Sequence, residues 1–315
     1  MESKTNKEKI NPEEFFAIGQ YEENTNWFFG REEEIKRIIH RIKTRQSTSI
    51  IGKDNIGKSF LLEKIFHLAE EQLDPNEFSI LRLSLKDAAF QKQFLFLKSI
   101  LRKLNFENNI RGNLDINKAL VSFSDSIEKL DKTILLLIDD FDRGMNKEKF
   151  SKDFYDDMHD KIGHRKIVFV TASKHSIKFS SMTGGLTSSF FLVFDTVELG
   201  PFQKSEAFDY IYSLFDMFGF RTQDQELLRN LCEAESNREP MQLKLACKTI
   251  HDIKKKKLKG QQLYKEFNKN FRKYEKTTKF TFLQSICFLF IKYVKGALGW
   301  ILKLLSVAKK AKDLS

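Results

Sequence analysis

A glycine-rich segment over residues 52–59, Gly-Lys-Asp-Asn-Ile-Gly-Lys-Ser, has the residue types and spacing of a phosphate-binding loop. Glycines let backbone N–H groups turn toward an anion, and a helix that begins at the end of the loop adds partial positive charge. Lys58 can reach the β- and γ-phosphates of a nucleoside triphosphate, and the Ser59 hydroxyl can coordinate Mg²⁺. We expect the rest of this loop to contact the nucleotide as well, through Gly52, Lys53, Asp54, Asn55, Ile56, Gly57 and Phe60.

A second acidic motif follows an unbroken apolar run at residues 133–138. Asp139, directly after the run, is placed to hold Mg²⁺ through the water shell of the ion. Asp140 is the predicted catalytic carboxylate that orients the attacking water. Aspartate is one methylene shorter than the glutamate common at this position, so we predict slow hydrolysis. An acidic turn that only caps the strand is the alternative for Asp140 and, with more weight, for Asp142.

A third polar position comes at the end of the β-branched run at residues 166–171. Thr171 and Ser173 are candidates for contact with the γ-phosphate or the attacking water, although strand ends also favour Ser and Thr for structural reasons. Of the two, Thr171 joins Lys58 and Asp140 as a predicted catalytic residue. No guanine-reading motif of the [NT]KxD type follows a predicted strand, so we expect the nucleotide to be ATP.

These residues need a scaffold, and the hydrophobic periodicity provides one. Short apolar runs alternate with segments of helical spacing, which predicts an α/β fold with a parallel sheet covered on both faces, the three-layer P-loop NTPase arrangement. The predicted strands are 47–51, 78–85, 133–138, 166–171 and 190–199. Helices are predicted at 58–72, 90–104 and 115–130, and one more precedes the first strand, with its apolar positions at Ile35, Ile38, Ile39 and Ile42.

After Gly200-Pro201 the pattern changes to consecutive helices, which we interpret as a helical lid subdomain. Its predicted helices are 203–217, 224–235 and 239–257. The domain organisation predicted from these changes is a flexible N-terminal segment (1–26), a P-loop domain (27–200), the lid (201–257) and a basic, apolar amphipathic tail (258–315).

Charge is distributed unevenly along the 315 residues. Residues 252–315 hold 17 Lys or Arg and 4 Asp or Glu, so the first 251 residues of a chain with net charge +11 carry about −2. A partner that is attracted by this positive charge is therefore expected to bind the tail. Three scattered cysteines and a charged N-terminus without an apolar run argue against a disulfide framework, a zinc site and a signal peptide, and favour the cytoplasm.

The tail combines lysines with a strongly apolar stretch at 280–308. Lys292 and Lys295 argue against a simple transmembrane span, because a lysine at the bilayer centre costs about 2.5–3.5 kcal/mol. On a helix the polar residues form a narrow cationic stripe, which suits the inner membrane surface or a pore built by several copies. A partner protein, a core helix or a solvated lysine face are the alternatives. Nucleic acid is a weaker expectation, since no winged-helix or zinc-finger pattern is present.

With these parts in order, residues 27–255 resemble the STAND branch of AAA-like P-loop ATPases. The resemblance rests on the P-loop, the Asp139 to Asp142 cluster, the segment Phe29-Gly30-Arg31-Glu32, and Leu199-Gly200-Pro201-Phe202 followed by Glu206-Ala207. It implies that backbone around Phe29 and Gly30 lines the adenine pocket and that Pro240 belongs to a lid over it. It also implies that ATP closes the lid and promotes homo-oligomerisation. The sequence Asn237-Arg238-Glu239-Pro240 departs from the glycine-containing turn of the family.

The sequence thus predicts an ATP-binding, slowly hydrolysing switch of the STAND type that uses Mg²⁺ and acts through its tail, at a membrane or in oligomerisation. The alternative is a DNA-associated AAA+ ATPase, similar to initiators and loaders, that places its lysine-rich segment on phosphates. Candidate arginine fingers are Arg143, Arg165 and Arg238.

Overall fold

The computed structural model describes residues 28–273, except 88–89, 91, 107–115, 254–255, 257 and 260. The predictions for residues 1–26 and for the apolar stretch at 280–308 lie outside the described residues. Five parallel strands form one sheet in the order β2-β3-β4-β1-β5. Their bounds are β1 Thr48–Ile51, β2 Phe78–Ser84, β3 Thr133–Asp139, β4 Ile167–Ser173 and β5 Asp195–Glu198.

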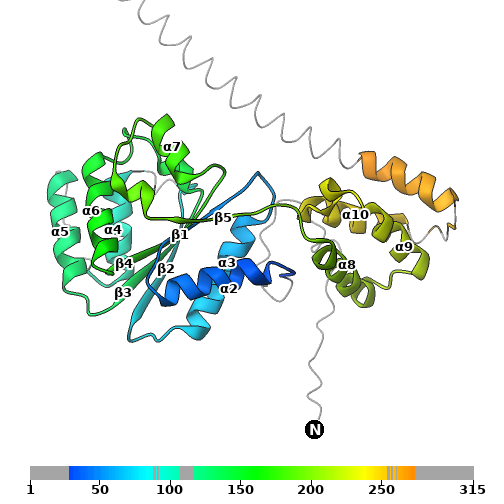
Figure 1. The fold of residues 1–315 in the computed structure, drawn as a ribbon, viewed down its shortest axis with the longest axis horizontal. Coiled ribbons are helices and arrows are strands. Elements are labelled where there is room, and N and C mark those ends of the chain that lie inside the picture. Colours follow the sequence, from blue (N-terminus) through cyan, green and yellow to red (C-terminus); the bar gives the residue numbers. More distant parts are fainter. Residues whose placement is uncertain are drawn as a thin grey trace, which may run out of the picture. The chain divides into compact units, whose positions relative to one another are not determined.

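Helices cover both faces of this sheet (Figure 1). On one face lie α2 (Glu32–Lys43) and α3 (Lys58–Gln72), packed on the side chains of Ile50, Leu135 and Val170. On the other face lie α4 (Gln93–Lys103), α5 (Ile116–Glu128) and α6 (Lys152–Gly163). The predicted three-layer α/β fold with a parallel sheet is therefore confirmed.

The central strand β3 shows why the apolar run forms a strand at this place. All seven of its residues are buried, with Ile134, Leu136 and Ile138 on one face and Leu135 and Leu137 on the other. Burial of each such side chain contributes about 1.5–3 kcal/mol. Because the strand is anchored on both sides, the acidic pair that follows it is held at a fixed position at the carboxyl edge of the sheet.

Two parts of the α/β region differ from the sequence prediction. The strand predicted at 190–199 begins as a 3₁₀ turn, η5 (Ser189–Leu192), and only Asp195–Glu198 joins the sheet. Helices α6 and α7 (Ile177–Thr183) were not predicted at all. Helix α6 has no strong aliphatic stripe, because it packs through Phe154, Tyr155 and Met158 instead.

The chain forms two compact units. The first comprises the described residues up to 213 together with 229–243, and so takes in the sheet, residues 204–213 of α8 (Lys204–Phe218) and the start of α10 (Pro240–Ile253). The second comprises 214–228 and the described residues from 244 onward, with part of α9 (Thr222–Leu231) and a helix over 261–273. No helix within the described ranges has the length and apolar character that crossing a bilayer requires.

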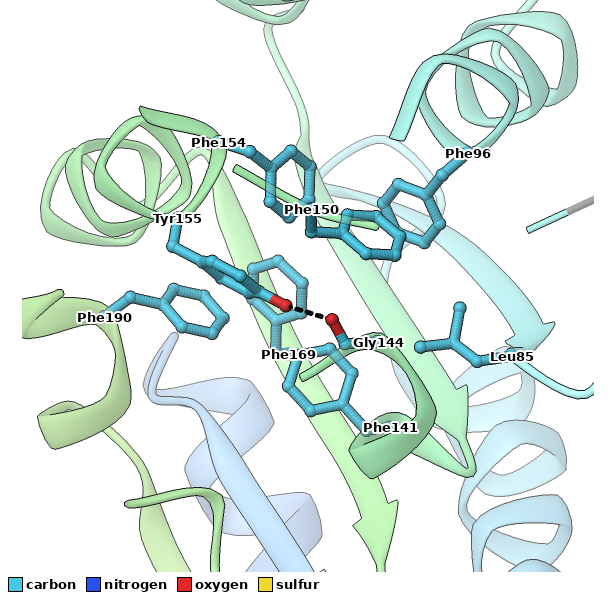
Figure 2. Close-up of a pocket in the computed structure, with 9 residues that line it drawn as sticks. All are labelled: Leu85, Phe96, Phe141, Gly144, Phe150, Phe154, Tyr155, Phe169 and Phe190. Atoms are coloured by element: carbon cyan, nitrogen blue, oxygen red, sulfur yellow. Dashed lines mark hydrogen bonds between the residues drawn. The ribbon is translucent and has the colours of Figure 1, made fainter. Parts of the chain in front are cut away.

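An aromatic cluster supports the turn that follows the acidic pair. This turn, η4 (Phe141–Gly144), lies against side chains from α4, α6 and β4 (Figure 2). The buried Tyr155 hydroxyl points into the cluster and donates to the Gly144 carbonyl oxygen at 2.9 Å. The gap between these side chains is about 10 Å³, enough for no more than one water. Its lining is Leu85, Phe96, Phe141, Gly144, Phe150, Phe154, Tyr155, Phe169 and Phe190. The cluster is core, and it fixes the backbone just after Asp140.

Candidate nucleotide-binding site

The glycine-rich segment links β1 to α3 at the carboxyl edge of the sheet, and its two pattern glycines answer different needs. Gly57 caps α3 with φ of 100°, a backbone conformation that side chains disfavour. Gly52 lies so close to β5 that a Cβ there would be 2.9 Å from the Leu199 carbonyl oxygen. The loop between them is therefore fixed in a curve that turns toward the N-terminus of α3, where four backbone N–H groups have no helical partner.

Lys58 folds back over this loop. Its Nζ donates to the backbone oxygens of Gly52 at 2.7 Å and Lys53 at 2.8 Å. Burial lowers the pKa of its ammonium group, while nearby carboxylates, chiefly Asp54 and then Asp139, raise that pKa and so favour the charged form. A charged ammonium held at the mouth of a curve of backbone N–H groups is a receptor for phosphate oxygens.

The acidic pair stands two strands away from the loop, because β4 lies between β1 and β3. Asp139 is buried, and its Oδ1 accepts from the Asp140 backbone N at 2.9 Å. Asp140 has φ of 52°, which turns the chain into η4. Its carboxylate forms ion pairs with Lys86 at 3.0 Å and with Arg143 at 3.7 Å. Asp139, Asp140 and Asp142 all contribute to the electrostatic field at Lys58.

Thr171 and Ser173, the two candidates at the end of β4 for contact with the γ-phosphate or the attacking water, lie in different surroundings. Thr171 is level with Ser49 and Ile138, fully buried, and its Oγ1 has no hydrogen-bond partner within the described residues. Ser173 is level with Ile51 at the end of the strand, and its hydroxyl donates to the His175 carbonyl oxygen at 2.8 Å. The catalytic role of Thr171 stays a prediction; in this conformation its hydroxyl lies inside the core.

Lys174, the next residue, reaches the phosphate loop itself. Its Nζ lies 2.8 Å from the Asp54 carboxylate, and both side chains are about half exposed. The sequence analysis missed Lys174, although its place directly after a predicted strand end is a usable signal. Such a pair contributes about 0–1 kcal/mol to stability, so the contact matters for the position of the loop more than for the fold.

A second ion pair joins the loop to the start of α10. Lys53 pairs with Glu239, the residue before Pro240. A Cβ at Gly57 would lie 4.0 Å from the Pro240 ring, so the proline is next to the end of the loop. The structure thus places Pro240 beside the phosphate loop, and its role in a lid over the adenine pocket stays a prediction. Glu239 was missed, because sequence alone gives no sign that it meets a residue so far away in the chain.

The segment Phe28 to Arg31 contacts both sides of the site. The rings of Phe28 and Phe60, the third residue of α3, are 5.3 Å apart between centroids. Phe29 turns the other way and meets Tyr210 of α8 edge-to-face at 5.4 Å. Gly30 has φ of 70°, and a Cβ there would lie 2.9 Å from Glu206 Oε1.

Arg31 completes the contact between these two distant segments. Its backbone N donates to Glu206 Oε1 at 2.6 Å. Its buried guanidinium group pairs with Glu34 at 3.2 Å, donates to the Gly200 carbonyl oxygen and lies 4.8 Å from the centre of the Phe202 ring. We call the contact of Gly30 and Arg31 with Glu206 the Glu206 clasp. Two of the four motifs that carried the family resemblance, the segments that begin at Phe29 and at Leu199, are therefore in direct contact.

No protein-family model and no curated protein sequence matches this chain. Solved structures do match it. The Walker-type ATPase PABY2304 of Pyrococcus abyssi is 12% identical with a TM-score of 0.57, over 86% of this chain and 79% of that one. The ORC2 protein of Aeropyrum pernix, in ADPNP–ADP complexes, is 12% identical with a TM-score of 0.56, over 81% of this chain and 71% of that one. Drosophila ORC bound to DNA is 12% identical with a TM-score of 0.55, over 82% and 64%.

The chain has the fold of a P-loop NTPase. At 12% identity these matches show the fold alone, and they do not distinguish the STAND branch from other AAA-like proteins. Strand β1, the phosphate loop and helix α3 follow one another directly in the chain, which is the order that a P-loop requires.

In a P-loop NTPase the magnesium ion needs few protein ligands, because phosphates and waters fill most of its coordination shell. Ser59 in the first turn of α3 and Asp139 at the end of β3 fit this need. Among the described residues there is no group of three or more His, Cys, Asp or Glu side chains that would hold a metal ion by itself.

The three candidate arginine fingers occupy different places. Arg143 is close to Asp140 of its own chain. Arg165 precedes β4 and so lies at the amino edge of the sheet, away from the phosphate loop. Arg238 directly precedes the loop contacts at 239–240, and its backbone oxygen accepts from Phe202 N at 3.0 Å. The choice among them stays open as a prediction.

Proposed function

We propose that this chain is a Mg²⁺-dependent ATPase that uses bound ATP as a switch and hydrolyses it slowly. The observation that carries the proposal is the position of Lys58, whose ammonium group lies on the backbone of the phosphate loop and in the electrostatic field of Asp54 and of the acidic cluster that begins at Asp139. Lys58 would bind the β- and γ-phosphates, Ser59 and Asp139 would hold Mg²⁺, and Asp140 would orient the attacking water. When ATP binds, the Lys53–Glu239 ion pair would break. The change at Glu239 would pass to α10 and promote homo-oligomerisation.

Titration of the full-length chain with ATP in a calorimeter tests this proposal. We expect saturable binding that weakens when EDTA removes Mg²⁺, because the ion neutralises phosphate charge in the loop. GTP should compete poorly. Absence of heat with ATP at millimolar concentration, with and without Mg²⁺, would disprove nucleotide binding by this loop.

We propose DNA as the partner of this ATPase, in the manner of initiators. Two of the similar solved structures are described as bound to or in complex with DNA. In this chain the helix over 261–273 buries Leu263 and Phe267 and exposes Lys265, Lys269 and Arg272 on the opposite side. Spacings of four and three residues place these cations in one stripe. Among residues 261–273 the one acidic side chain, Glu266, pairs with Lys256. A stripe of three exposed cations of this kind fits the phosphates of a nucleic acid.

Retention of double-stranded DNA at increasing salt tests the stripe. The triple variant Lys265→Gln, Lys269→Gln, Arg272→Gln should bind more weakly, and the slope of log K against log salt should fall by about one for each cation removed. Lys36→Gln, an exposed lysine in the other compact unit, is the matched control and should leave the slope unchanged. Equal slopes for wild type and triple variant would rule out this stripe as the contact.

The second candidate is the STAND-type switch acting at a membrane, and the apolar stretch at 280–308 favours it. In this case the protein would be cytoplasmic and attached to the inner face of the membrane by its tail. Flotation of the full-length chain with anionic liposomes separates the two candidates. Flotation that survives high salt, without DNA retention, would favour the membrane.

A further inference from the structure

One carboxylate joins the start of α8 to the segment that precedes α2. Glu206 Oε1 accepts from the Arg31 backbone N at 2.6 Å, and Glu206 Oε2 accepts from the Gln203 backbone N at 2.7 Å. The second bond is the reciprocal half of a capping box, in which the third residue of a helix accepts from the residue before the helix. The first bond goes to a residue 175 positions away in the chain. Capping of helix α8 does not explain this bond to Arg31, because the cap requires only the bond to Gln203.

The turn that receives this bond needs outside support. Gly30 and Arg31 both have positive φ, of 70° and 65°. For a residue with a side chain this conformation costs about 1–3 kcal/mol and persists only where surrounding contacts enforce it. Glu206 supplies a hydrogen bond to Arg31 and lies against the Cα of Gly30, where a Cβ would be 2.9 Å from Oε1. The carboxylate therefore helps to fix the course of the chain at residues 29–31.

This course decides where the Phe28 ring lies. Phe28 is two residues before the Gly30–Arg31 turn, and its ring is 5.3 Å from that of Phe60, which directly follows Ser59. If Lys58 binds the β- and γ-phosphates, the base would lie at the opposite, α-phosphate end of the site, and we assign this end to the side of Phe60 in the first turn of α3. Phe28 and Phe60 are both partly exposed, so a base on this side meets aromatic faces on which it can stack.

We propose that Glu206 is a positioning residue for the base end of the nucleotide site. Its carboxylate holds the Gly30–Arg31 turn and thereby keeps Phe28 beside Phe60. The inference rests on the proposed ATP binding by the loop. It predicts that Glu206 affects affinity for nucleotides that carry a base, and not affinity for the phosphates alone.

Competition binding with two ligands tests this inference in the full-length chain with Mg²⁺. ATP and inorganic triphosphate each displace a fluorescent ATP analogue, so both affinities come from one assay. For Glu206→Ala we expect the affinity for ATP to fall about tenfold while the affinity for triphosphate stays within about twofold. Phe28→Ala should show the same selective loss, because it removes the ring that the clasp positions.

Two further variants control the result. Glu206→Gln removes the charge but keeps one acceptor oxygen, so it should fold if alanine does not, and its loss of ATP affinity should be intermediate. Glu233→Gln changes an exposed carboxylate paired with Lys204 near the same helix, and should alter neither affinity.

Each remaining outcome counts against the inference. If the Glu206 variants lose affinity for ATP and triphosphate equally, the carboxylate supports the fold of the whole site rather than its base end. If they lose neither, the Phe28 position does not depend on the clasp. Failure of the wild type to bind both ligands would instead overturn the proposed function, so the two failures are distinguishable.

Discussion

Replacement of Lys58 by alanine is expected to lower the affinity for ATP at least about a hundredfold. The ammonium group sits at the mouth of the phosphate loop on two backbone oxygens, which phosphate oxygens would replace. Loss of one partner from a hydrogen-bonded charge pair in a binding site costs about 2–5 kcal/mol. Calorimetric titration with ATP and Mg²⁺ measures the change.

Lys53→Ala is the matched control for this variant. Lys53 belongs to the same loop, but its side chain points to Glu239 and is about half exposed. We expect its loss to change ATP affinity by less than about threefold, because alanine keeps the backbone N–H through which residue 53 would contact the phosphates, and an exposed ion pair contributes little. If Lys58→Ala bound ATP as the wild type does, the loop would not be the nucleotide site and the proposed switch would fail.

Replacement of Asp140 by asparagine should separate binding from hydrolysis. ATP affinity should stay within about threefold, whereas single-turnover hydrolysis should slow by about 10²–10⁴-fold, the usual contribution of a general base. Asparagine is a suitable replacement here, because Asn and Asp tolerate the φ of 52° at this position better than other residues do. Cleavage of radiolabelled ATP by excess protein measures the chemical step without product release.

Asp142→Asn provides the comparison, since Asp142 lies in the same turn and carries the same charge. It should hydrolyse ATP within about threefold of wild type. Equal slowing by both variants would mean that the acidic turn acts through its total charge, and Asp140 would lose its assigned role. A wild-type rate for Asp140→Asn would contradict that role directly.

The helices and strands that were predicted correctly are those that depend on interactions between residues close in the sequence. The helix predicted at 58–72 has these bounds in the structure, because a glycine with positive φ starts it and an apolar stripe continues to its end. Strand β3 was visible because both of its faces are buried, which leaves a run of apolar residues and a sharp change at Asp139. The phosphate loop follows from these two elements, since its glycines are needed for backbone geometry that the neighbours impose.

The features that sequence analysis missed depend on contacts between distant residues. Helix α6 packs through aromatic side chains, so its apolar pattern is weak, and η5 packs Phe190 into the same cluster where a strand was predicted. Lys174, Glu239 and the clasp carboxylate Glu206 are ordinary charged residues until the fold brings their partners near. Phe28 was not among the predicted site residues, and only the structure shows that its ring lies beside Phe60 while the Phe29 ring meets Tyr210.

The place of β1 in the sheet has a consequence for synthesis of the chain. Thr48 pairs on one side with Val170 and on the other with Asp195, so neither neighbour of β1 exists when this strand leaves the ribosome. The phosphate loop must wait, unpaired and with an apolar strand before it, until most of the α/β region has been made. Such non-local pairing slows folding and exposes strand edges to aggregation. Nascent chains that stop before residue 195 should therefore depend on chaperones, and ATP can assist folding only after β5 has been made.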